Sequence, residues 1–134
     1  MTPVTPDVID MLDPNQIFVF GSNEAGKHGK GAALVAIRNF GAKRGQGYGR
    51  QGQSFAIPTK SGDMKTLRLS TIKASVDKFL CYANNNKHLS FLVTRIGCGL
   101  AGYKDTEIAP LFREALNTPN ISLPLSFVKI LGTL

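Results

Sequence analysis

The sequence has no tryptophan, only two cysteines, and no long apolar run. Cys81 and Cys98 are too few for a disulfide framework or a cysteine-based zinc site, and nothing else indicates an oxidising compartment. No apolar stretch approaches the roughly 18 residues of a membrane helix. The first 13 residues carry three aspartates, where a signal peptide would carry lysines. We therefore expect two free thiols in a cytoplasmic protein that has no membrane partner.

The chain is long enough for one folded domain. Its 134 residues are 43% hydrophobic and 19% charged, which provides apolar material for one core and excludes global disorder. We expect a single domain that spans residues 1–134.

Acidic residues are almost missing from the middle of the chain. Between Lys27 and Lys73 there are ten Lys or Arg residues against Asp63 alone, a net charge of +9. Such a block attracts a polyanion, either nucleic acid or a phosphorylated small molecule. A solvated basic face is the alternative, and charge alone leaves both open.

Short apolar runs alternate with helical patterns. The spacing predicts strands at 17–20, 54–57, 89–96 and 126–131, and helices at 32–40, 71–83 and 107–116. Pro110 is tolerated only if it lies in a first helical turn. Residues 45–52 are too rich in glycine for a regular element, so we expect a loop there. Strands that alternate with helices indicate an α/β sheet with a parallel component.

Two glycine-rich segments, 21–31 and 97–102, each follow a predicted strand and precede a predicted helix. In open α/β sheets the ligand crevice lies at the carboxyl ends of the strands, and backbone N–H groups there can bind anions. Neither segment is a Walker or dinucleotide-binding motif. Together they predict a site for two phosphates.

His28 and His88 lack metal-ligand spacing, so we expect no metal and no cofactor.

These motifs carry a family resemblance. Phe20-Gly21-Ser22-Asn23, followed by Gly29-x-Gly31-Ala32-Ala33 and a helix ending at Phe40-Gly41, resembles the first ligand loop of macro domains, which bind ADP-ribose and its derivatives. Arg95-Ile96-Gly97-Cys98-Gly99-Leu100 looks like their second, diphosphate-binding loop. Ala56-Ile57-Pro58-Thr59-Lys60 is similar to a strand of the terminal ADP-ribose protein glycohydrolases, and small macro-like proteins of phages and bacteria also look similar.

The resemblance covers about residues 17–116 and implies a three-layer α/β/α fold with a mixed central sheet. It also implies a ligand crevice between the two glycine loops. The residues expected to bind the ligand are Phe20, Gly21, Ser22, Asn23, Gly29, Gly31, Ala32, Pro58, Thr59, Ile96, Gly97, Cys98, Gly99, Leu100, Ala101, Gly102 and Tyr103. Asp10 and Asp13 are candidates for the early aspartate with which many macro domains read adenine.

The catalytic residues of the family are only partly present. Lys60 matches the lysine that attacks the ribose carbon in the glycohydrolase subgroup, but Ala101 replaces its acid/base aspartate. Asn23 matches the asparagine of the other hydrolytic branch, but Ala33 replaces the acid that follows it. Both arrangements therefore lack their carboxylate.

Several of these residues also have plainer interpretations. Asp105 and Glu24 are nearby acids that could substitute for the missing carboxylate. Lys60 could be a surface lysine or a phosphate contact, because a nucleophilic amine needs a lowered pKa. Cys98 is interpreted as a small residue that lets the backbone approach a ligand, and Tyr103 either covers the distal ribose or packs against the last helix.

Three functions remain. The first is binding of ADP-ribose or a related nucleotide, free or attached to protein or nucleic acid. The second is an ADP-ribosyl hydrolase. The third is an RNA-binding accessory protein that uses Arg44, Tyr48 and Arg50 for charge and stacking, although the loop that carries these residues could equally be a flexible rim of the crevice. The missing carboxylates favour binding, because general acid/base catalysis contributes about 10²-fold to 10⁴-fold.

Overall fold

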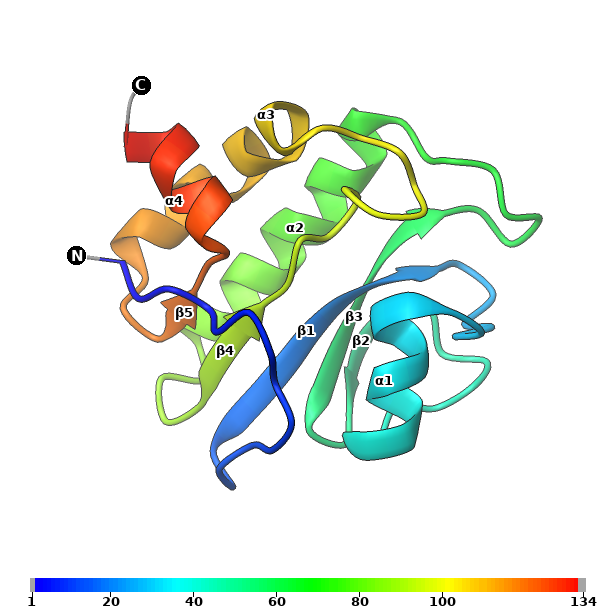
Figure 1. The fold of residues 1–134 in the computed structure, drawn as a ribbon, viewed down its shortest axis with the longest axis horizontal. Helices are drawn as coiled ribbons and strands as arrows, with labels where there is room; N and C mark the ends of the chain where they lie inside the picture. The colour runs from blue at the N-terminus through cyan, green and yellow to red at the C-terminus, as the bar shows by residue number, and fades with distance from the viewer. Residues whose placement is uncertain (1, 133–134) are drawn as a thin grey trace.

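A five-stranded mixed sheet with the strand order β2-β3-β1-β4-β5 organises the protein (Figure 1). The computed structural model describes residues 2–132. β1 is parallel to β3 and β4, β4 is parallel to β5, and β2 is antiparallel to β3. The strands are β1 (Gln16–Asn23), β2 (Gly49–Gln51), β3 (Ser54–Lys60), β4 (Ser90–Val93) and β5 (Ile121–Ser122). The helices are α1 (Gly31–Asn39), α2 (Leu69–Asn84), α3 (Asp105–Ile108), the 3₁₀ helix η1 (Ala109–Asn117) and α4 (Leu125–Gly132).

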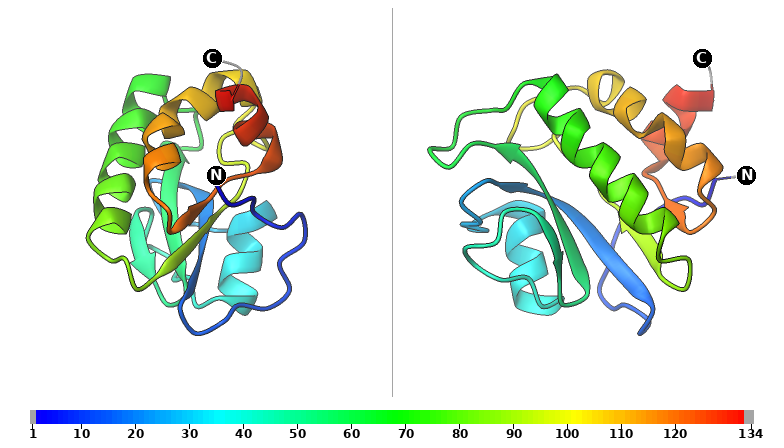
Figure 2. Two further views of the ribbon diagram at one scale, coloured as in Figure 1. Left: turned by 90° about the vertical axis from the view of Figure 1, so that its left-hand side faces the viewer. Right: turned by 180° about the vertical axis from the view of Figure 1, so that it is seen from behind.

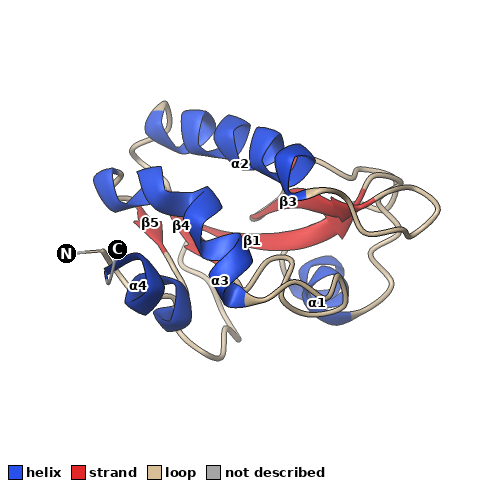
Figure 3. Cartoon of the chain, turned by 90° about the horizontal axis from the view of Figure 1, so that it is seen from above, coloured by secondary structure: helices blue, strands red, loops and turns tan. Residues whose placement is uncertain are grey.

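The side chains of β1 alternate between two apolar layers, as expected for a strand buried on both faces. Ile17 and Val19 join a large cluster with residues of α2, η1 and α4. Phe18 and Phe20 join a smaller cluster with residues of α1. Figure 3 shows α1 and α2 on opposite sides of the sheet. The expected three-layer α/β/α fold with a mixed sheet is confirmed.

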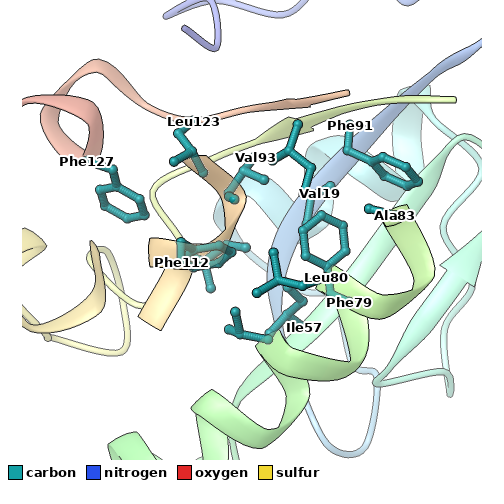
Figure 4. Close-up of a cluster of buried hydrophobic side chains, with 14 of the residues drawn as sticks. Val19, Ile57, Phe79, Leu80, Ala83, Phe91, Val93, Phe112, Leu123 and Phe127 are labelled. Carbon is teal, nitrogen blue, oxygen red and sulfur yellow. The ribbon is translucent and has the colours of Figure 1, made fainter. Parts of the chain in front are cut away.

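The larger layer depends on the apolar face of α2. Ile72, Val76, Phe79, Leu80 and Ala83 are all buried, at the helical spacing that the sequence predicts. The ring of Phe79 meets that of Phe91 on β4 edge to face, at 5.4 Å between centroids. Figure 4 shows Phe79, Leu80 and Ala83 of α2 in one cluster with Val19 of β1, Phe112 of η1 and Phe127 of α4.

The predicted closing strand at 126–131 is wrong, because this segment is the helix α4. Pro124 precedes the helix, and its carbonyl accepts hydrogen bonds from the N–H groups of Phe127 and Val128. Phe127 and Leu131, four residues apart, are the two buried side chains of one helical face. A short apolar run cannot be distinguished from a buried helix by periodicity. The last strand is instead the two-residue β5, which pairs with β4.

Further boundaries differ from the sequence prediction, and β1 and β3 each continue three residues beyond their predicted ends at 20 and 57. The glycine-rich segment 45–52 contains the short edge strand β2, which pairs with β3. The strand expected at 89–96 is limited to β4, and the helix expected at 107–116 is divided into α3 and η1. Pro110 lies in the first turn of η1, the position where proline was expected to be tolerated.

The parallel arrangement brings the carboxyl ends of β1, β3 and β4 to one edge of the sheet. The segments that follow these strands project from this edge, as the views from the front and from behind show (Figures 1 and 2). No helix in residues 2–132 has the length and apolar character needed to cross a membrane.

Candidate functional site

A cavity of about 540 Å³ opens at the carboxyl edge of the sheet. We call it the first cavity. Its walls come from the end of β1, the first loop (residues 24–30), the start of α1, the end of β3 and the second loop (residues 94–104). The lining residues are Gly21, Ser22, Asn23, Lys27, His28, Gly29, Lys30, Gly31, Ala32, Ala33, Thr59, Lys60, Met64, Thr94, Arg95, Ile96, Gly97, Gly99, Leu100 and Ala101. The volume falls in the range of small-molecule sites.

The charged residues that line the first cavity all carry positive charge. They are Lys27, Lys30, Lys60 and Arg95, and no acidic residue among residues 2–132 lines this cavity. Lys60 is half-buried at the end of β3, whereas Lys27 is exposed on the first loop. The cavity therefore attracts an anion.

The first loop is shaped by Asn23, which is buried at the end of β1. Its side-chain oxygen accepts a hydrogen bond from the N–H of Lys27 at 3.1 Å, and its carbonyl accepts one from the N–H of Gly26 at 2.9 Å. These bonds fold the loop back over the end of β1. Asn23 thus has a structural role in addition to its place in the cavity wall.

The glycine-rich segment 45–49 packs against the backbone at the end of β1 and in the first loop. A Cβ atom on Gly47 would lie 2.4 Å from the carbonyl oxygen of Asn23, and one on Gly26 would lie 2.4 Å from the backbone nitrogen of Gln46. The hydroxyl group of Ser22 donates a hydrogen bond to the carbonyl of Gly47. The two backbones therefore approach so closely that glycine is needed on both sides.

His28 joins the first loop to the same segment. Its ring is fully buried, and Nε2 lies 3.0 Å from the carbonyl oxygen of Gln46 and 3.1 Å from Oε1 of Gln51. The amide group of Gln51 is oriented by a bond from the N–H of Lys43 to its Oε1. Both neighbours of Nε2 are acceptors, so this nitrogen carries the proton. Among the described residues, no cluster of His, Cys, Asp or Glu side chains could hold a metal ion.

The second loop turns sharply at Gly97, where φ is +78°. A Cβ atom there would lie 2.8 Å from the Cδ1 atom of Ile108. Gly99, two residues later, lines the cavity, and a Cβ atom there would meet nothing within 4 Å. Gly97 is therefore needed for the shape of the loop, whereas Gly99 leaves its backbone open to a ligand.

Cys98 and Tyr103 pack against the main core. Burial, assisted by the carboxylate of Asp105, raises the pKa of the Cys98 thiol to about 12. The thiol therefore stays protonated and is unsuited to nucleophilic attack. The hydroxyl group of Tyr103 donates a 2.6 Å hydrogen bond to the carbonyl of Leu67, which fixes the second loop to the segment before α2.

Lys60 and Ala101 lie on either side of Thr66. The backbone of Thr66 forms an antiparallel bridge with Lys60, and its hydroxyl group donates a 3.0 Å hydrogen bond to the carbonyl of Ala101. Both Lys60 and Ala101 line the first cavity. A carboxylate at position 101 would thus share this cavity with the Lys60 amine.

A second cavity of about 870 Å³ adjoins the first. It lies between the N-terminal segment, α1, β4 and the start of α4, and its wall includes Asp7, Asp10 and apolar side chains such as Val8, Val35 and Leu125. The two cavities share Ala32, Thr94 and Arg95. A ligand with two unlike ends could therefore extend from the cationic first cavity into the second cavity, whose acidic residues are Asp7, Asp10 and Asp105.

Most of the residues expected to bind a ligand lie in the wall of the first cavity. Phe20, Pro58, Cys98, Gly102 and Tyr103 do not. Phe20 faces the α1 layer instead. Of the two early aspartates, Asp10 lines the second cavity and Asp13 does not. Other residues of the wall were not among those expected to bind the ligand, and their place depends on how the loops fold: Lys27, His28, Lys30, Ala33, Met64, Thr94 and Arg95.

The fold and the cavities describe an α/β/α protein with an anion-attracting crevice at the carboxyl edge of its sheet. Its fold is macro domain-like. A macrodomain protein from Streptomyces coelicolor superimposes with a TM-score of 0.59 and 18% identity, covering 92% of this chain and 95% of that chain. A protein of unknown function from Bacteroides thetaiotaomicron gives 0.63 and 17%, covering 86% and 88%. No protein-family model and no curated protein sequence matches the chain significantly.

Proposed function

We propose that the protein binds ADP-ribose, or a related nucleotide that contains ADP-ribose, in the two joined cavities. The observation that carries this proposal is the wall shared by a cationic cavity and a larger cavity that is lined by aspartates and apolar side chains. A diphosphate with a sugar on one side and a base on the other has matching chemistry. The macro domain-like fold supports the same class of ligand.

The resemblance also suggests how the ligand lies. The distal ribose would approach Lys60 and Asn23, and the diphosphate would contact the backbone of the second loop near Gly99. The base would enter the second cavity, where the Asp10 carboxylate is available to accept a hydrogen bond from an exocyclic amine. A protein or nucleic acid that carries ADP-ribose would then be a partner.

Calorimetry with ADP-ribose, AMP, NAD and a short RNA tests the proposal. We expect ADP-ribose to bind more tightly than AMP, because AMP lacks the second phosphate and the distal ribose that would occupy the first cavity. Tight RNA binding without ADP-ribose binding would favour the third function, for which Arg44, Tyr48 and Arg50 remain candidates.

The salt dependence of binding distinguishes a small diphosphate from RNA. Each phosphate neutralised on a single strand contributes about −0.7 to the slope of log K against log salt. We expect a shallow slope for ADP-ribose, because it presents only two phosphates and lacks the condensed counterions of a nucleic acid. A titration series in increasing NaCl measures the slope. A slope several times steeper for RNA would indicate that the basic residues between Lys27 and Lys73 contact a nucleic acid.

Hydrolysis of an ADP-ribose linkage is the second candidate function. Lys60 lies in the first cavity, but among residues 2–132 no carboxylate lines that cavity to move protons. Asp105 pairs with Arg95, which lowers the pKa of its carboxyl group to about 2. Such a carboxylate stays ionised at neutral pH and cannot act as a general acid. We therefore expect slow or absent turnover.

The Ala101→Asp variant tests whether only the carboxylate is missing. We expect it to hydrolyse an ADP-ribosylated substrate faster than the wild-type protein, by about 10²-fold if general acid/base catalysis is restored. Adding Lys60→Ala should cancel the gain. Ala101→Asn is the neutral control. Rapid wild-type turnover that depends on Lys60, Asn23 or Asp105 would contradict this expectation and support a hydrolase with its own arrangement.

A further inference from the structure

The wall between the two cavities contains one charged residue. Of the three residues that line both cavities, Ala32 and Thr94 are neutral, and Arg95 alone carries charge. The Arg95 side chain is 59% exposed. A ligand that extends from one cavity into the other must pass the guanidinium group of Arg95.

Asp105 holds this guanidinium group in a fixed orientation. Nη2 of Arg95 lies 2.6 Å from Oδ1 of Asp105, and Nε lies 3.2 Å from Oδ2. The Asp105 side chain is only 18% exposed and lines the second cavity. A two-point contact between an arginine and a carboxylate fixes the plane of the guanidinium group as well as its position.

The pairing leaves part of the guanidinium group for a ligand. An arginine has five N–H donors, and the contact with Asp105 uses the one on Nε and one on Nη2. No other hydrogen bond to this group is formed within residues 2–132, so three donors remain, two on Nη1 and one on Nη2. These two nitrogens form the second edge of the fork, which matches two oxygens of a phosphate group. Asp105 largely neutralises the charge of Arg95. Arg95 therefore attracts a phosphate group mainly at hydrogen-bonding distance.

We propose that Arg95, oriented by Asp105, makes the site selective for diphosphates over single phosphates. This inference deepens the proposed function and rests on it for the natural ligand. Lys27, Lys30 and Lys60 provide positive charge for one phosphate in the first cavity. The free edge of Arg95 binds the next phosphate at the point where the cavities meet. A lone phosphate is satisfied by the lysines and has no need of Arg95.

Inorganic pyrophosphate and orthophosphate test the inference without a nucleotide. We expect the wild-type protein to bind pyrophosphate more tightly than orthophosphate. Arg95→Gln should lower pyrophosphate affinity by about 10-fold to 100-fold, the range for hydrogen bonds to charged groups. It should change orthophosphate affinity less than about threefold. Arg113→Gln is the matched control, because Arg113 is exposed and lines neither cavity.

The loss of Arg95 leaves the carboxylate of Asp105 without this partner, and the carboxylate could itself repel anions or weaken the fold. The double variant Arg95→Gln/Asp105→Asn removes both charges. We expect it to unfold near the wild-type temperature and still to bind pyrophosphate about tenfold more weakly than wild type. Arg95→Lys, which keeps the charge and loses the fork, should lie between the wild-type protein and Arg95→Gln.

Three results would overturn the inference: no pyrophosphate binding by the wild-type protein, equal pyrophosphate affinity in the wild-type protein and the double variant, or equal losses for both anions. A parallel titration with ADP-ribose separates the two proposals. If pyrophosphate binding depends on Arg95 but ADP-ribose does not bind, the inference about the diphosphate site is supported and the proposed function is wrong. If ADP-ribose binds the wild-type protein and the double variant with equal affinity, the proposed function is supported and Arg95 has no role in binding this ligand.

Discussion

The Gly99→Glu variant should lose at least about 100-fold in affinity for ADP-ribose, or about 2.7 kcal/mol, while its thermal stability stays near that of wild type. Gly99 lines the first cavity, and a Cβ atom at this position meets nothing within 4 Å. The glutamate is therefore accommodated without displacing the backbone. Its carboxylate would enter a cavity lined by Lys27, Lys30 and Lys60, where it neutralises the lysines and repels a phosphate group.

The Gly99→Gln variant is the control, because it has the same length and no charge. We expect it to bind ADP-ribose more tightly than Gly99→Glu, so that the difference between the two measures the effect of the charge. Calorimetry gives the affinities, and thermal unfolding monitors the fold. If Gly99→Glu binds ADP-ribose with wild-type affinity, the second loop does not bind the phosphates.

The layered fold could be predicted because its main elements carry their own patterns. β1 contains an unbroken apolar run at 17–20 that is buried on both faces, and α2 places five apolar residues at helical spacing on one face. The last element could not be predicted in this way. Its apolar residues follow Pro124 in a run that is too short to separate strand from helix, and packing against η1 decides the outcome.

The two glycine loops could also be located from the sequence, because parallel strands end at one edge of the sheet. The direction of individual side chains within the loops could not. Cys98 packs against the core and Tyr103 bonds to Leu67, whereas Gly97 and Gly99 line the first cavity. The contact between Arg95 and Asp105 joins residues ten positions apart through the turn at Gly97, and no local pattern indicates it.

The glycine-rich segment 45–49 has no local pattern that reveals its role, because its contacts lie about twenty residues earlier in the chain. Its glycines allow two backbones to meet: the Gly26 carbonyl accepts a 2.9 Å hydrogen bond from the N–H of Gly45, and Gly47 lies against Asn23 and Glu24. A segment that the sequence presents as a flexible loop or an RNA contact thus forms the support of the first loop. Its rigidity should influence ligand binding directly.

The Gly47→Ala variant tests this dependence. Its added Cβ atom would lie 2.4 Å from the carbonyl oxygen of Asn23 and 2.6 Å from that of Glu24, closer than such atoms can approach. Both are backbone atoms, so the first loop must shift. We expect the free energy of unfolding to fall by about 1–3 kcal/mol, the usual effect of overpacking. We also expect ADP-ribose affinity to fall at least about tenfold, because a displacement of about 1 Å in a positioned site is costly.

Gly62→Ala is the matched control for this substitution. A Cβ atom on Gly62 would have its nearest neighbour, the Cβ atom of Ala25, at 3.7 Å, which is an ordinary contact. Denaturant unfolding and calorimetry on both variants should therefore show losses of stability and affinity for Gly47→Ala alone. If Gly47→Ala loses stability but binds ADP-ribose as well as the wild-type protein, the first loop does not position the ligand. The binding site would then rest on the second loop and the second cavity.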